Sequence, residues 1–236
     1  FFVQAKIDTI IEQFPDFQVA VLIANNLSSP ETVPPALAEE IAAIEAGALA
    51  LHADKGMGEI PGVAVWRNAY KAFGVRKTSY RCSVERLIRK VRRDGKMAQI
   101  HPFVDAYNAV SLKHVFPLGA DDLDKIVGDV SFREAREGDT FFALGQQPPR
   151  NDPPKTGEII YADDKKVLCR RWNWYQDIRS PVTPEAKRAI VTIQSLGAGD
   201  LNAAVDDLER LLRTWFGAEV AHVTLNVANP VADLPI

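Results

Sequence analysis

Cysteine and histidine are scarce in this sequence of 236 residues. It contains two cysteines, Cys82 and Cys169, and four histidines. Two cysteines cannot form a disulfide framework or a four-cysteine zinc site, and we expect both to be buried small hydrophobic residues. A cysteine nucleophile needs a histidine base nearby, and the four histidines are scattered along the chain. Disulfide-stapled and cysteine-nucleophile classes are therefore disfavoured.

Long apolar runs and several common motifs are also missing. No segment approaches the roughly 20 residues that cross a bilayer, and the N-terminus lacks the basic region and apolar core of a signal peptide, which predicts a cytoplasmic protein. The patterns GxxxxGKS/T, GxGxxG, GxSxG and HExxH do not occur. Residues 119–124 (GADDLD) carry three acids but do not match an EF-hand loop. We therefore expect neither a cofactor nor a metal.

The composition, with 47% hydrophobic and 25% charged residues, is that of an ordinary soluble globular protein. The length suits one domain of α/β (α+β) type, and no internal repeat or second domain boundary is apparent. We predict a single domain over residues 1–236, with a core from about 7 to 225. Residues 145–156 are rich in proline and predict an exposed loop.

Hydrophobic periodicity and turn residues predict a mixed or antiparallel β-sheet core with flanking helices. The expected strands are residues 17–23, 125–136, 140–144, 158–162, 167–173, 189–196 and 219–225. The expected helices are residues 36–51, 61–73, one with Ser83 as its N-cap, one beginning at Pro102, and 201–216 with Asp200 as its N-cap. Residues 119–124 are expected to form a turn, residues 6–14 show mixed signals, and the tail from residue 226 is expected to be loose.

Positive charge is concentrated in one segment, although the formal net charge is −3. Between Arg67 and Arg93 lie ten Arg and Lys residues and a single acid, Glu85. Such a local basic surface predicts a docking face for a polyanion, and a solvated helix face is the alternative. The residues expected to bind a phosphate backbone are Lys77, Arg81, Arg86, Arg89, Lys90, Arg92 and Arg93.

The stretch from residue 100 to 121 (IHPFVDAYNAVSLKHVFPLGAD) combines an acid, an amide and a hydroxyl in one helical segment. Side chains three and four positions apart meet on a helix, so Val104, Asn108 and Ser111 share a face, with Asp105 beside them. Polar groups on an inward face need a functional or structural reason. We therefore expect a polar pocket beside this helix.

The run VDAYNAVSL followed by FPLG, together with GEIIYADD and CRRWNW further on, resembles the B3/B4 domain. This domain is the editing and tRNA-binding module of the phenylalanyl-tRNA synthetase β subunit, and it also occurs as a freestanding protein. The resemblance covers residues 7–225. It implies a B3/B4-like fold and a freestanding deacylase that hydrolyses the ester between a wrong amino acid and the 3′ end of tRNA. Such an ester is already activated, so a positioned water and an oxyanion donor suffice.

The resemblance also implies site residues. Asn108 matches the asparagine of the family's Thr-Asn pair, and Tyr107 stands where the threonine is expected. Pro117 matches the proline of the family's Gln-Pro step, and Gly119 replaces the editing histidine two residues later. The catalytic positions expected are therefore Asn108, Ser111 and Gly119. The substrate-binding residues expected are Asp105, Tyr107, Pro117, Glu158, Asp163 and Arg170.

The amino acid removed depends on the charge of this pocket. Members of this family remove tyrosine from phenylalanine tRNA or canavanine from arginine tRNA. A guanidinium-like side chain needs a carboxylate in planar contact, and Asp105, Glu158 or Asp163 could supply one, so we favour a cationic arginine analogue. A non-catalytic tRNA- or RNA-binding module and a domain acting on a small aminoacyl ester remain the alternatives.

Overall fold

The computed structural model describes residues 3–236. Its central sheet is antiparallel, in the order β3-β8-β2-β9. The strands are β2 (Phe17–Asn25), β3 (Leu118–Asp122), β8 (Ala189–Leu196) and β9 (Glu219–Leu225). Apart from Gln18, residues 17–24 of β2 are buried on both faces, which explains the apolar run VAVLI and confirms the strand expected at residues 17–23.

A second sheet lies against one face of the first and is mixed, because β1 and β4 pair in parallel while its other strands pair antiparallel. Its order is β10-β1-β4-β5-β6-β7. The strands are β1 (Gln4–Ile7), β4 (Val130–Glu134), β5 (Ile159–Ala162), β6 (Val167–Arg170), β7 (Tyr175–Gln176) and β10 (Val231–Asp233). Together the two sheets and the helices confirm a single α/β domain.

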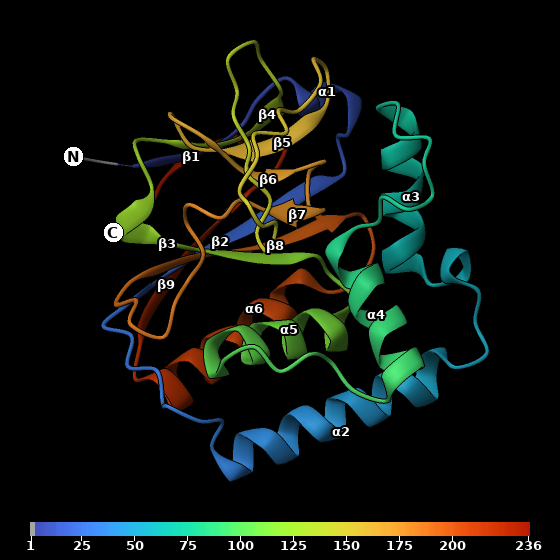
Figure 1. The fold of residues 1–236 in the computed structure, drawn as a ribbon, viewed down its shortest axis with the longest axis vertical. Helices are drawn as coiled ribbons and strands as arrows, with labels where there is room; N and C mark the ends of the chain where they lie inside the picture. Colours follow the sequence, from blue (N-terminus) through green and yellow to red (C-terminus); the bar gives the residue numbers. More distant parts are fainter. Residues whose placement is uncertain (1–2) are drawn as a thin grey trace.

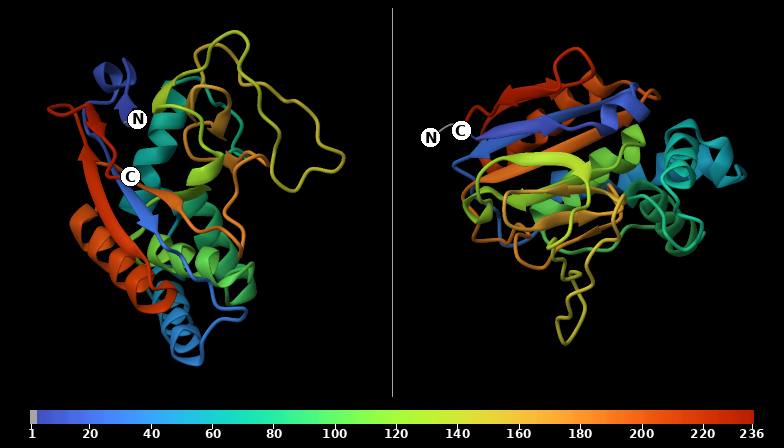
Figure 2. Two further views of the ribbon diagram at one scale, coloured as in Figure 1. Left: turned by 90° about the vertical axis from the view of Figure 1, so that its left-hand side faces the viewer. Right: turned by 90° about the horizontal axis from the view of Figure 1, so that it is seen from above.

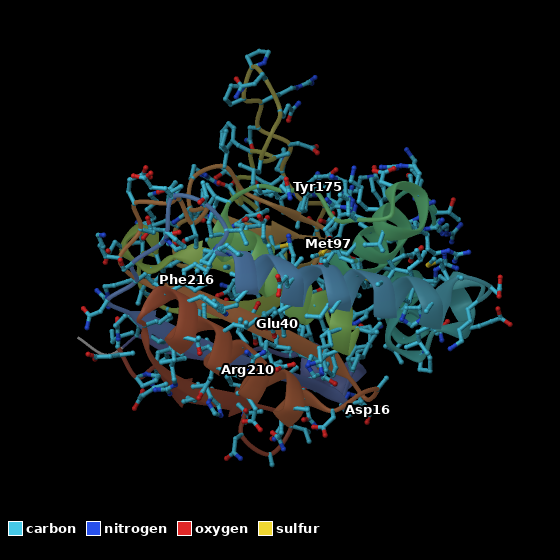
Figure 3. The ribbon with its side chains drawn as sticks, turned by 90° about the horizontal axis from the view of Figure 1, so that it is seen from below. Asp16, Glu40, Met97, Tyr175, Arg210 and Phe216 are labelled. Atoms are coloured by element: carbon cyan, nitrogen blue, oxygen red, sulfur yellow. The ribbon has the colours of Figure 1, made fainter. Side chains whose placement is uncertain are left out.

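Helices cover the other face of the central sheet and one end of the molecule (Figure 1). They are α1 (Ile10–Gln13), α2 (Pro35–His52), α3 (Pro61–Ala72), α4 (Ser83–Asp94), α5 (Pro102–His114) and α6 (Leu201–Phe216), with 3-10 turns η1 (Met57–Glu59) and η2 (Leu123–Lys125). Helices α5 and α6 pack on the sheet, and α2 lies outside them (Figure 1). An ion pair between Glu40 and Arg210 ties α2 to α6 (Figure 3). None of the described helices is long and apolar enough to cross a membrane.

Apolar side chains fill the space on both faces of the central sheet. Between the two sheets, the rings of Phe17, Trp66 and Trp172 meet edge to face at centroid distances of 4.8 to 6.4 Å. On the opposite face, Phe103 of α5 packs against Phe216 of α6 at 5.6 Å. Successive residues of β2 point alternately into the cluster between the two sheets and into the cluster between the central sheet and the helices. β2 therefore fixes the separation of these layers, from which the site is built.

Several expected segments differ from the structure. Residues 119–122 are not a turn but belong to β3, and the strand expected at 125–136 is limited to β4. Residues 140–144 form isolated bridges instead of a strand, and the tail includes β10, which pairs with β1. The strand expected at 167–173 ends at Arg170 because Arg171 and Trp172 have φ of 46° and 64°, which breaks the extended backbone.

The proline-rich residues 145–156 extend away from the body of the molecule (Figure 2). All of them are exposed except Pro154. The N-cap of α4 is Cys82 and not Ser83, and it makes no side-chain cap hydrogen bond, whereas Asp200 caps α6 as expected by accepting from the backbone N–H of Ala203.

Candidate functional site

The candidate site is a cavity of about 620 Å³. Its lining comes from β3 and β8 of the central sheet, β5, β6 and β7 of the second sheet, and the helices α4 and α5. Elements that are up to about a hundred positions apart in the sequence therefore meet around one hollow, between Arg81 and Gln194. This volume lies within the range of about 300–1,000 Å³ that is typical of small-molecule sites.

The floor of the cavity follows from the register between β3 and β8. Gly119 lies opposite Thr192, and Asp121 lies opposite Ile190. Directly opposed residues of an antiparallel pair share a face, and residues two apart on a strand do so as well. Gly119, Asp121, Thr192 and Gln194 therefore point to the same side, and all four line the cavity.

A chain of hydrogen bonds orients the floor. The Tyr70 hydroxyl donates to Asn173 Oδ1 at 2.9 Å, and Asn173 Nδ2 donates to Gln194 Oε1 at 3.0 Å. Gln194 Nε2 then donates to Thr192 Oγ1 at 3.3 Å. Because Thr192 accepts from within the protein, its own hydroxyl proton is left to donate to a group in the cavity.

Asp121 is the acid of the cavity. It is 4% exposed, and its Oδ1 accepts from Ser180 Oγ at 2.7 Å and from Gln176 Nε2 at 3.0 Å. Burial raises the pKa of this carboxyl to about 7, and the hydrogen bonds from Ser180 and Gln176 and the nearby charge of Lys166 offset only part of that effect. A buried acid with a pKa near neutrality in a cavity is typical of a functional group.

Two side chains beside Asp121, those of Cys169 and Tyr161, have raised pKa values that disfavour a nucleophilic role at neutral pH. Burial is the main cause that raises the pKa of the Cys169 thiol to about 12. Burial also raises the pKa of Tyr161 well above its ordinary value. Both residues line the cavity in their protonated forms. Cys82 is buried as expected, whereas Cys169 is only partly buried and lines the cavity.

Helix α5 forms one wall. Val104, Tyr107 and Asn108 line the cavity, and within residues 3–236 the Asn108 amide has no hydrogen-bond partner. Ser111 lies one turn further on and is outside the lining; its hydroxyl donates to the Phe116 carbonyl at 2.5 Å. The structure thus places Ser111, which was expected at a catalytic position, outside the cavity lining and at the C-terminal turn of α5.

All three acids expected to bind substrate are engaged elsewhere. Asp105 accepts from the backbone N–H of Ile100 at 2.9 Å, and Asp163 pairs with Lys166 at 2.5 Å. Glu158 pairs with Arg170 at 2.9 Å. None of these residues lies in the cavity lining, nor does Pro117. Of the expected substrate-binding set, the structure brings only Tyr107 to the cavity.

Gly119 leaves open space in the floor of the cavity. A Cβ atom built on Gly119 would lie 4.0 Å from Thr192 Oγ1, which is an ordinary van der Waals contact. The glycine is therefore not required by close packing. Its effect is to enlarge the cavity beside the hydroxyl of Thr192.

The basic segment forms one side of the cavity. Its lining includes Arg81, Arg86, Arg89, Lys90 and Arg93. Two expected phosphate-binding residues lie elsewhere: Lys77 lines a separate hollow of about 160 Å³, and Arg92 donates to the carbonyls of Ala53 and Lys55 after α2. The structure thus brings five of the seven expected residues to the cavity.

Acids neutralise part of this surface. Glu85 is 1% exposed and lies 2.7 Å from Arg67, 2.9 Å from Arg89 and 3.4 Å from Arg81. Burial by itself raises the pKa of Glu85, but hydrogen bonds from Arg67 and Arg89 outweigh it and the net pKa is lowered. Glu85 is therefore ionised at neutral pH and fixes the spacing of three guanidinium groups.

Cation–π contacts with aromatic rings position two arginines beside the cavity, Arg86 and Arg171. Arg86 donates to the Trp174 carbonyl at 2.5 Å and lies over the Tyr175 ring, 4.1 Å from its centroid. Figure 3 shows Tyr175 on the side of the molecule that carries α4 and the 145–156 loop. Arg171 lies between the rings of Tyr80 and Trp174, at 3.6 and 4.2 Å from their centroids. We call the basic side of the cavity, lined by Arg81, Arg86, Arg89, Lys90 and Arg93, its rim. The rim thus combines cations with neighbouring aromatic faces, a combination that is typical of sites that bind single-stranded nucleic acid.

The sequence analysis missed several cavity residues. These are Asp121, Tyr161, Gln176, Thr192 and Gln194. One signal was present: Thr192 and Gln194 are polar residues two apart in a strand that begins with the apolar run AIV, which indicates a polar patch on one face of a sheet. Among residues 3–236, no group of three or more His, Cys, Asp and Glu side chains is arranged to hold a metal ion.

Comparison with known proteins places this architecture in a family. The sequence matches the B3/4 domain family over residues 65–202, which is more than half of the chain. The chain therefore belongs to the B3/4 domain family.

Two relatives are individually similar to it. The chain is 36% identical over 83 residues to the phenylalanine–tRNA ligase beta subunit of Francisella tularensis subsp. tularensis; the match spans 35% of this chain and 10% of that protein. The crystal structure of an N-terminal fragment of the phenylalanyl-tRNA synthetase beta subunit from Pyrococcus horikoshii superposes with a TM-score of 0.48 and 12% identity, covering 94% of this chain and 54% of that one. The chain thus spans only part of the proteins that it matches.

Proposed function

We propose that this B3/4 domain is a trans-editing aminoacyl-tRNA deacylase, which hydrolyses the ester that joins a wrong amino acid to tRNA. The observation that carries this proposal is the oriented hydrogen-bond chain that ends at Thr192 in a cavity with a basic rim. Membership of the B3/4 family and the similarity to a subunit named as a tRNA ligase support it. The substrate's phosphates bind the rim, and its ester enters the cavity.

The chemistry requires no covalent nucleophile. An aminoacyl ester is activated, so hydrolysis needs a water held beside the carbonyl carbon and a donor for the developing oxyanion. The Asn108 amide and the Thr192 hydroxyl both line the cavity and both can donate to a bound group. One holds the water and the other stabilises the oxyanion, while the space beside Gly119 accommodates the aminoacyl group.

The tRNA is held through its acceptor end. The rim residues Arg81, Arg86, Arg89, Lys90 and Arg93 contact phosphates, and the aromatic faces of Trp174 and Tyr175 contact the terminal bases. Helix α4 presents Arg86, Arg89, Lys90 and Arg93, and Arg81 lies in the loop before it. Glu85 fixes the spacing of Arg81 and Arg89.

The proposal is tested by incubating the purified chain with a panel of misacylated tRNAs that includes canavanyl-tRNA(Arg) and tyrosyl-tRNA(Phe). We expect release of the amino acid from at least one of them. Asn108→Ala and Thr192→Val should each lower kcat/KM at least about tenfold, because one oriented donor in the transition state contributes a few kcal/mol. Release is measured by acid precipitation of labelled aminoacyl-tRNA.

A matched control is Asn202→Ala, since Asn202 is an exposed asparagine in the first turn of α6. It should leave deacylation unchanged. Circular dichroism melts show whether each variant folds. If the protein binds tRNA and releases no amino acid from any member of the panel, the chain is a tRNA- or RNA-binding module without catalysis.

A further inference from the structure

Asp121 differs from most other buried acids of the described chain because it has no basic partner. The buried acids are Glu85, Asp105, Asp121, Asp122, Glu158, Asp163 and Asp177. An Arg or Lys lies within 4.0 Å of every one of them except Asp105 and Asp121. Buried charges are normally paired. The two exceptions therefore need an explanation.

Asp105 is explained by its position in the fold. It lies in the first turn of α5, accepts from the backbone N–H of Ile100, and is outside the cavity lining. A carboxylate at a helix N-terminus is stabilised by the helix dipole and by backbone N–H groups. Asp121 lies in a strand and has no such support.

The hydrogen bonds of Asp121 leave one oxygen available. Ser180 and Gln176 both donate to Oδ1, and within residues 3–236 no group donates to Oδ2. Gln176 is itself fixed, because its amide also donates to the Ala120 carbonyl at 2.6 Å. The carboxyl group is thus held in one orientation with a vacant acceptor at the cavity.

Tyr161 supplies a second unsatisfied group in the same lining. Its hydroxyl is buried and has no hydrogen-bond partner among the described residues. The ring is held in place by stacking on Phe132 at 4.6 Å. Buried polar groups without partners are uncommon in native proteins and often mark a place where a ligand binds.

We propose that the Asp121 carboxylate and the Tyr161 hydroxyl form a subsite that binds a cationic nitrogen group of the ligand. This inference rests on the proposed function, in which the group belongs to the aminoacyl end of the substrate. A cationic nitrogen group that donates to Oδ2 supplies the positive charge that no Arg or Lys of the described chain places beside Asp121. It deepens the earlier expectation of a carboxylate in the pocket, because Asp121 takes the role that the sequence assigned to Asp105, Glu158 or Asp163.

Charge separation across the cavity fixes the direction of binding. Arg81, Arg86, Arg89, Lys90 and Arg93 are on the α4 side, and Asp121 is on β3. The α4 side attracts phosphates and repels cations, whereas the Asp121 carboxylate attracts cations and repels phosphates. A substrate with a phosphate at one end and a cationic nitrogen at the other therefore binds in one orientation.

Two nitrogen groups of an aminoacyl-tRNA have this chemistry: the α-ammonium group and a cationic side chain. They are distinguished with tRNA(Arg) charged with canavanine, with citrulline, which is a neutral analogue of similar shape, and with the N-acetylated form of each. Removing the group that binds Asp121 should lower the wild-type kcat/KM about 30-fold, as expected for a lost charge-assisted hydrogen bond in a buried site.

The decisive variant is Asp121→Asn. Its Oδ1 can still accept from Ser180 and Gln176, while the negative charge is removed. We expect this variant to hydrolyse the cationic and the neutral substrates at similar rates. A wild-type protein without any preference for the cationic forms, or an Asp121→Asn variant that keeps the preference, would overturn the subsite.

Two further variants separate this role from a structural one. Asp122→Asn is the matched control, because Asp122 follows on the same strand, points to the opposite face and pairs with Lys125 at 3.1 Å; it should keep the preference. Tyr161→Phe removes only the unpaired hydroxyl and should raise KM for the cationic substrate about fivefold with little change in kcat. An unchanged KM would remove Tyr161 from the subsite.

Direct binding distinguishes failure of the subsite from failure of the proposed function. The probes are arginine amide, citrulline amide and the N-acetyl derivative of each, titrated calorimetrically into the complete chain. The subsite is supported if the wild-type protein binds the citrulline probes or the N-acetylated probes more weakly than arginine amide and Asp121→Asn shows no such difference. This result would support the subsite even if no tRNA is deacylated. Equal binding of all four probes to the wild-type protein rejects the subsite, while deacylation of any tRNA would leave the proposed function standing.

Discussion

At the scale of single residues, ionisation of Asp121 opposes folding. Burial raises the pKa of its carboxyl to about 7 in the folded protein, whereas an unfolded aspartate has a pKa of about 3.9. Both states are protonated below pH 4, so Asp121 carries no ionisation penalty there. The penalty grows as the pH rises from about 4 to 7 and is constant above pH 7.

Asp121→Asn should therefore stabilise the protein at high pH and not at low pH. The gain at pH 8 is at most on the order of 4 kcal/mol, and it should vanish near pH 4. Urea unfolding of both proteins at pH 4, 6 and 8 measures this difference. The other titratable groups that act on Asp121 or are affected by it are Tyr107, Tyr161, Asp163, Lys166 and Cys169.

The control for this measurement is Asp122→Asn, which removes the ion pair with Lys125 and should not stabilise the protein at any of these pH values. If Asp121 binds the substrate, Asp121→Asn should gain stability and lose the preference for the cationic substrate. Natural proteins retain destabilising groups where function needs them. Equal free energies of unfolding for Asp121→Asn and wild type at pH 8 would show that ionisation of the Asp121 carboxyl does not destabilise the folded protein.

At the scale of secondary-structure elements, Glu85 joins α4 to α3 and to the loop before α4. Removing its charge in Glu85→Gln leaves Arg67, Arg81 and Arg89 without their common partner. Loss of one member of a buried pair costs about 3–5 kcal/mol. Water can solvate these arginines, whose side chains are 33–38% exposed, so we expect a smaller loss of about 1–3 kcal/mol.

The pH dependence of this loss follows from the lowered pKa of Glu85. Its contribution to stability is present above the unfolded pKa of about 4.3 and is lost as the pH falls through the lower folded value. Thermal melts at pH 7 should show a lower Tm for Glu85→Gln, and the difference from wild type should shrink in acid. The comparison is Asp206→Asn on α6, an exposed acid that forms no ion pair among the described residues, and its Tm should stay close to that of wild type.

The elements themselves were largely predictable. Periodicity and caps correctly indicated β2, β8, β9, α2, α3, α5 and α6. Residues 119–124 were misassigned because Gly119, Asp121 and Asp122 are turn-forming types, and nothing in the local sequence shows that Gly119 and Asp121 line a cavity from within a strand. The strand expected at residues 140–144 failed for the opposite reason, since an apolar run there packs as a loop.

At the scale of the whole molecule, the candidate site was only partly predictable. The basic helix and Asn108 are visible in the sequence because each lies within one amphipathic element. Asp121 and Ile190 are 69 positions apart and meet through strand pairing, as do Gly119 and Thr192. Strand order and register are not encoded in local patterns, so neither the polar floor nor the isolation of Asp121 from basic partners could be derived before the fold was known.

The distribution of charge over the molecule yields the last prediction. The net charge is −3, so attraction of a polyanion must come from the local basic rim and should depend steeply on salt. Arg93 is 70% exposed at this rim, and Arg93→Gln should weaken tRNA binding and reduce the slope of log K against log salt by about 1. Arg213→Gln on α6, whose side chain is 52% exposed and lies outside the cavity lining, should leave the slope unchanged. Filter binding between about 50 and 300 mM salt measures both slopes. If the two variants give the same slope as wild type, the rim does not contact phosphates and the tRNA binds a different face.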